Sequence, residues 1–115
     1  MNNPTMEVSI MSTTTENKII NLKNSLDYKK ESIVTHIISK NKNTSIVGYA
    51  FDRGQSILPC TAEVNATIHI LEGRAEVMIA GKNYDLDEGE MILMPKNKPH
   101  ALFAKTKLKL ALFKG

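Results

Sequence analysis

The sequence contains no tryptophan and few other aromatic residues, with only three phenylalanines and three tyrosines in 115 residues. Aromatic side chains therefore cannot fill much of a hydrophobic core, and the interior must be mainly aliphatic. The hydrophobic share of 42% and the charged share of 23% are ordinary for a globular protein. A chain of this length fits one domain with one core.

A second cysteine, a secretory leader and long apolar runs are also missing. Cys60 is the only cysteine, so no internal disulfide can form. The polar stretch 1–18 lacks the basic and then apolar pattern of a signal peptide. No apolar run approaches the roughly 18 residues that a membrane helix needs. These absences predict a cytoplasmic protein that has no membrane partner.

The charge balance is close to even, with a net charge of +3. Lys105, Lys107 and Lys109 alternate near the end of the chain, as lysines on an exposed strand often do. No aromatic residues accompany them as a stacking platform, so a nucleic-acid partner is not expected.

The chain divides into a polar start and a longer part that is rich in short strands. Residues 1–18 are predicted to form a flexible tail or short arm, with a short strand at Glu7–Met11, and residues 19–115 a single β-barrel domain. Short strands at regular spacing, separated by Gly, Pro, Asn and Asp, are typical of an all-β sandwich or barrel. A short helix or turn is expected around 22–28. The expected strands are 32–39, 44–51, 66–71, 74–80, 83–86, 90–94, 100–104 and 108–114.

Alternation along the strand at 66–71 predicts which side chains face inward. Ala66, Ile68 and Ile70 share the apolar face, which is expected to form core. His69 lies on the opposite face and is expected to point to solvent or to a subunit contact. The faces of His36 and Glu63 cannot be assigned from the pattern.

The order of turns in the last two-thirds of the chain resembles a small single-domain cupin of the type-2 conserved barrel, or RmlC-like, group. Gly54 and Gly73 bound the first cupin stretch, and Gly89, Pro95 and His100 mark the second. The resemblance implies a double-stranded β-helix, or jelly roll, in which two antiparallel sheets close a barrel.

The same resemblance shows what this chain lacks. Cupin metal sites use two histidines and a glutamate from the first stretch and one histidine from the second. Here these positions fall at Cys60, Ala62, near Ala66, and at His100, so only His100 is retained. A first-row metal needs about three or four protein ligands. No cofactor is therefore expected, and Cys60 and His100 are weak candidates for a divalent metal. Whether the protein is an enzyme stays open, and the missing ligands argue against it.

Cys60 and His100 are nevertheless expected to lie close together and to project into the barrel, because the two cupin stretches meet there. Three interpretations stay open: core packing, a pocket in which His100 anchors a small organic ligand, or an activated thiolate–imidazolium pair. The residues predicted to line that pocket are Cys60, Ile68, Ile70, His100 and Leu102.

The strand at 32–39 is apolar on both faces, and a one-domain barrel has only one interior. A homodimer that covers the outer face around Ile33 to Ile38 is therefore predicted. Three functions are compatible with the sequence: binding of a small molecule in the barrel, a metal-dependent oxygenase or isomerase that uses His100 and Cys60, and a non-catalytic dimerisation or regulatory module.

Overall fold

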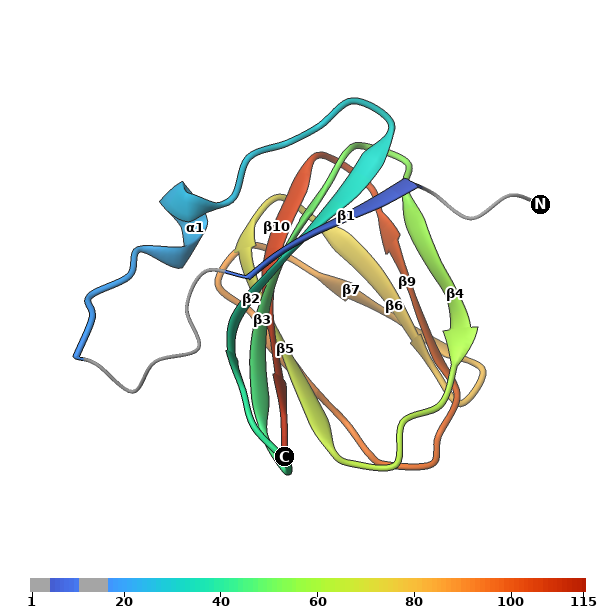
Figure 1. Ribbon diagram of the computed structural model, residues 1–115. Helices are drawn as coiled ribbons and strands as arrows, with labels where there is room; N and C mark the ends of the chain where they lie inside the picture. Colours follow the sequence, from blue (N-terminus) through green and yellow to red (C-terminus); the bar gives the residue numbers. More distant parts are fainter. Residues whose placement is uncertain (1–4, 11–16) are drawn as a thin grey trace.

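The computed structural model describes residues 5–10, as backbone, and residues 17–115. The described part is almost entirely β-structure, with one helix of four residues, α1 (Leu22–Ser25) (Figure 1). Its strands are β1 (Thr5–Ile10), β2 (Ser32–Lys40), β3 (Ser45–Phe51), β4 (Ser56–Cys60), β5 (Ala66–Glu72), β6 (Ala75–Ile79), β7 (Lys82–Leu86), β8 (Met91–Met94), β9 (His100–Ala104) and β10 (Leu108–Lys114).

Two sheets face each other and close the barrel. One sheet has the order β1-β2-β3-β10-β5-β8, and the other has the order β4-β9-β6-β7 (Figure 1). All pairings are antiparallel except that of β1 with β2, which is parallel. This is the predicted double-stranded β-helix.

The core lies between the two sheets and is mainly aliphatic, as the composition predicts. Ala66, Ile68 and Ile70 on β5 are all buried, which confirms the predicted inward face of that strand. Phe51 is the one fully buried aromatic side chain among the described residues, and it packs with Ile33 and Val77 in the same core.

The strand predictions hold to within two residues at each end, with one omission. β4 was not predicted, and the reason is Pro59 within it, since proline cannot donate to a strand ladder and is confined to edge strands. β4 is an edge strand: it pairs only with β9, and its register shifts between Ile57 and Cys60. In the N-terminal part, the predicted strand at Glu7–Met11 corresponds to β1, while Met11 lies outside the described residues.

Residues 17–31, which precede β2 and contain α1, lie on the outer side of the six-stranded sheet (Figure 1). Leu26 is buried there, and Leu22 and Leu26 lie over Gly48 of β3. A Cβ added at Gly48 would lie 2.8 Å from Leu22 Cδ1, so a larger residue there would require the Leu22 side chain to move. Gly48 is the register partner of His36 on β2. The second layer that the apolar outer face requires is therefore supplied in part by the same chain.

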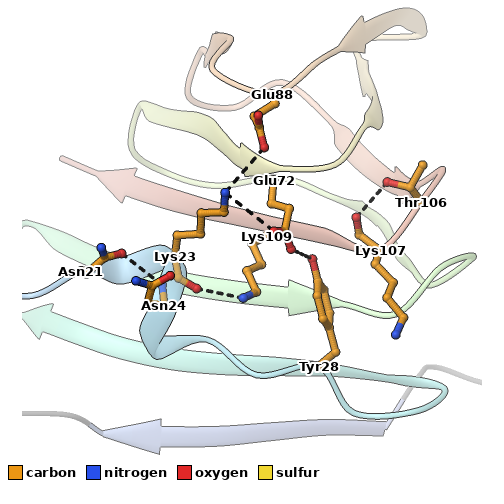
Figure 2. A network of polar contacts seen from close by, with 9 residues as sticks. All are labelled: Asn21, Lys23, Asn24, Tyr28, Glu72, Glu88, Thr106, Lys107 and Lys109. Carbon is orange, nitrogen blue, oxygen red and sulfur yellow. Dashed lines mark hydrogen bonds and ion pairs between the residues drawn. The ribbon is translucent and has the colours of Figure 1, made fainter.

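Polar contacts fasten this segment to the barrel (Figure 2). The Tyr28 hydroxyl donates a short hydrogen bond to Glu72 at the end of β5, and its ring lies beside the ammonium groups of Lys107 and Lys109 at 5.3 and 5.1 Å. Lys109 Nζ also donates to the Lys23 carbonyl at 2.9 Å. Lys23 Nζ in turn lies 3.7 Å from Glu72, so the segment is held at Lys23 within its short helix and at Tyr28 after the helix.

Candidate ligand pocket

Pairing of β4 with β9 places Cys60 directly opposite His100. Their side chains meet at 3.5 Å between Sγ and Nε2. The other ring nitrogen, Nδ1, lies 3.4 Å from the Lys98 carbonyl oxygen. A carbonyl oxygen only accepts, so in a neutral imidazole this contact favours the proton on Nδ1, and Nε2 then accepts from the Cys60 thiol. The expected proximity of the two residues is confirmed.

Both side chains face the cavity between the two sheets, but they do so from its edge. His100 is half-buried and Cys60 is exposed, so the pair lies at the rim of the barrel. The cause is the position of Cys60 at the last residue of an edge strand, after Pro59 and after the register shift. Among the described strands, β9 is the only one that pairs with β4.

Beside this pair lies a cavity of about 130 Å³ between the two sheets. Strands of both sheets contribute to its wall, and most of the wall is hydrocarbon. The lining residues are Tyr49, Phe51, Ile57, Cys60, Ala62, Ala66, Ile68, Met94, His100, Leu102, Leu110, Leu112 and Lys114.

Four of the five predicted pocket residues are among these lining residues: Cys60, Ile68, His100 and Leu102. Ile70 is not. It is fully buried in the core, although its register partner Leu110 on β10 lines the cavity. Shared inward parity with Ile68 made Ile70 a candidate, but parity does not tell which inward side chains border the cavity.

Sequence reasoning missed Tyr49 and Lys114. Tyr49 has the same parity on β3 as the buried Phe51, and Lys114 the same parity on β10 as Leu110 and Leu112. Alternation was therefore a usable signal for both. A lysine near the end of a chain is normally taken to be solvated. Only the pairing of β10 with its neighbours shows that Lys114 lies at the open end of the barrel.

The lining contains polar groups that can donate hydrogen bonds but contains no carboxylate. Burial raises the pKa of the Tyr49 phenol, and the nearby Cys60 raises it further, so the hydroxyl stays protonated at neutral pH and can donate. Lys114 is the one charged residue of the lining. No aspartate or glutamate belongs to it, and Glu63, which sequence alone could not place, is exposed outside it.

The two remaining histidines lie away from the cavity. His69 pairs in register with Ala111 and Met91, on the face of β5 opposite Ile68, as predicted. His36 pairs with Gly48, whose free side faces Leu22, and this places His36 on the outer face as well.

The residues at the cupin metal positions do not fit a first-row metal ion. Ala62 and Ala66 have no donor atoms, which leaves the Cys60 thiol and the His100 imidazole. Within residues 17–115 no group of three or more His, Cys, Asp or Glu side chains is placed to hold an ion. Protein sites for zinc, iron or manganese use three or four such ligands, so two donors would leave an ion mostly to water.

The paired sheets and the apolar cavity between them define this chain as a small double-stranded β-helix barrel. The profile of the Cupin domain family matches residues 50–113, which is more than half of the chain. The chain belongs to the cupin family.

Solved structures agree on the fold. A conserved protein of unknown function from Streptococcus pyogenes superposes with a TM-score of 0.82 at 25% identity, over 92% of this chain and 93% of that one. A cupin 2 conserved barrel domain protein from Leptotrichia buccalis gives 0.80 at 28% identity, over 83% of this chain and 46% of that one. A cupin superfamily protein from Desulfitobacterium hafniense DCB-2 gives 0.82 at 16% identity, over 90% and 94%, which is a likeness of fold alone.

No curated protein matches the sequence. Among the described residues, no helix is long and apolar enough to cross a membrane.

Proposed function

We propose that this cupin binds a small organic molecule in the barrel cavity and does so without a full metal site. The observation that carries the proposal is an apolar cavity of about 130 Å³ with a few polar groups at one end, at the place where the family's metal ligands are replaced by Cys60, Ala62 and Ala66. Ligand sites in proteins commonly combine an apolar wall with a small number of placed polar groups.

His100 has a defined part in this proposal. Its imidazole is held between the Cys60 thiol and the Lys98 carbonyl, so its orientation is set before any ligand arrives. With Nδ1 donating to the Lys98 carbonyl, Nε2 of a neutral imidazole is an acceptor, and a ligand hydroxyl group could take the place of the Cys60 thiol there.

The proposal is tested by a thermal-shift screen against small metabolites, followed by titration of the hits against His100→Ala. We expect the variant to fold and to bind the hits at least tenfold more weakly. His36→Ala, on the outer face, is the matched control and should bind normally. Normal binding of every hit by His100→Ala would reduce His100 to a packing role and remove the basis of the proposal.

A metal-dependent enzyme of the oxygenase or isomerase type is the second candidate, and the 3.5 Å approach of Cys60 to His100 is the observation that favours it. Elemental analysis separates the two, because stoichiometric metal that resists dialysis would support the enzyme. A screen without hits, together with a dimer in solution, would instead favour the dimerisation or regulatory module.

We also propose a cytoplasmic location, because the exposed, unpaired thiol of Cys60 suits a reducing compartment. Fractionation of the native host would test this.

A further inference from the structure

We propose that the ligand of the barrel cavity is a small apolar monocarboxylate, with a single ring or a branched chain of comparable size, whose carboxylate is bound by Lys114. The inference rests on the proposed function, since it names the chemical class of the molecule that the same cavity takes.

The charge of the lining residues determines the sign of the charge that a ligand should carry. Lys114 supplies a positive charge, and within the described part of the chain no ion pair or hydrogen bond occupies its ammonium group. The Tyr49 phenol remains a neutral donor, because burial raises its pKa. With no carboxylate in the lining, a cationic ligand would find no partner of opposite charge, whereas an anionic group would meet the Lys114 ammonium group and the Tyr49 hydroxyl as donors.

The position of Lys114 connects this charge to the cavity. It ends β10 on the inward face, in line with Leu110 and Leu112, and all three line the cavity. Its aliphatic stem therefore continues the apolar wall while the ammonium group reaches the open end, as long basic side chains commonly do. A ligand would place its body against the leucines and its charge beside Nζ.

The volume of the cavity determines the size of the apolar body. An apolar cavity of about 150 Å³ in another protein accommodates benzene, and this one has about 130 Å³. The wall of Ile57, Ile68 and Leu102 offers no polar group to a sugar or a peptide. One ring or a branched chain of about six heavy atoms is the body that fits.

The number of donors favours a carboxylate over a phosphate. A phosphate group carries close to two negative charges at neutral pH and is usually met by several cations or by a helix N-terminus. Here one lysine balances one charge, and the Tyr49 phenol in the same lining is a neutral donor. A singly charged carboxylate matches that set.

The test is a calorimetric titration with benzoate and with its neutral isostere benzamide, on the wild type, Lys114→Met and Lys82→Met. Lys82 is an exposed lysine on β7 outside the lining, and its variant is the matched control. We expect benzoate to bind about tenfold more tightly than benzamide to the wild type and to Lys82→Met. Lys114→Met should bind both compounds equally, and bound benzoate should slow alkylation of Cys60 at the rim.

Three results would overturn the inference, and they can be told apart. Benzamide binding as tightly as benzoate, with no effect of Lys114→Met, would refute the carboxylate class and leave the apolar pocket standing. Benzoate binding without protection of Cys60 would locate the anion site elsewhere. Failure of both compounds, together with an empty metabolite screen, would refute the proposed function itself.

Discussion

Two glycines have nearly the same backbone conformation but differ in how much space surrounds them. Gly73, between β5 and β6, has φ +88°, and Gly81, between β6 and β7, has φ +83°. A Cβ at Gly73 would collide with the carbonyl oxygen of Lys107 and lie 2.7 Å from Thr106 Oγ1, whereas a Cβ at Gly81 would meet nothing within 4 Å. The first glycine is required by both conformation and space, and the second by conformation alone.

We therefore expect Gly73→Ala to cost at least about 2 kcal/mol of unfolding free energy, because a backbone collision adds to the left-handed strain. Gly81→Ala should cost about 1 kcal/mol, the strain alone. Urea denaturation of the two variants measures the difference. Equal losses would mean that the turn at Gly73 relaxes without cost.

At the level of single residues, the resemblance to cupins correctly implied that Cys60 and His100 meet, because two stretches of a cupin come together in the barrel. It did not imply how exposed the two side chains are. Their exposure depends on β4 being an edge strand with a register shift, which no local pattern encodes. Ile70 was assigned to the pocket because alternation gives the face of a side chain but does not tell whether that side chain borders the cavity or is enclosed in the core.

The role of residues 17–31, which precede β2, was the hardest part of the fold to predict from the sequence. The helix in this segment has only four residues, too few for a periodic pattern, and the attachment of the segment depends on residues far along the chain. The Tyr28–Glu72 hydrogen bond joins positions 44 residues apart. Only the barrel brings them together, so the sequence could suggest a helix near 22–28 but not what the segment covers.

Tyr28→Phe tests that attachment through its pH dependence. The hydrogen bond from Tyr28 is the main reason why the pKa of Glu72 is lowered, and Lys109 and Lys23 lower it further. A carboxyl whose pKa is lowered by folding stabilises the fold above its unfolded pKa of about 4.3 and loses that contribution as the pH falls through the folded value.

We expect Tyr28→Phe to lower the unfolding free energy at pH 7 by about 1 kcal/mol, a modest loss because Glu72 is partly exposed. The difference from the wild type should shrink as the pH falls below the range in which glutamates ordinarily titrate. Urea denaturation at pH 7 and pH 3 measures it. Tyr84→Phe, at an exposed tyrosine of β7, is the control and should show no such trend. A loss that is independent of pH would mean that packing of the ring, rather than the bond to Glu72, holds the segment.

For the whole molecule, the internal cover by Leu22 and Leu26 changes where a partner subunit is expected. The dimer was predicted from the outer face of β2, yet the same chain covers the neighbouring part of that face at Gly48. The apolar side chains left uncovered lie on the other half of the sheet. Leu93 is 74% exposed and Met91 55% exposed on β8, and Phe113 on β10 is aligned with Leu93 through Thr67.

An exposed apolar group on a sheet face is typical of an interface between subunits, and a two-fold dimer is the commonest way to cover it. We therefore expect a homodimer through β8, β5 and β10, which sedimentation at micromolar concentration would detect as twice the chain mass of 12.8 kDa. Leu93→Glu should convert it to a monomer, because a carboxylate at the centre of an apolar interface would be desolvated without a partner. Leu58→Glu, at an exposed leucine on β4 in the other sheet, is the matched control and should remain dimeric. A wild-type monomer at that concentration would refute the dimer, and a dimer broken only by Leu58→Glu would place the interface on the four-stranded sheet.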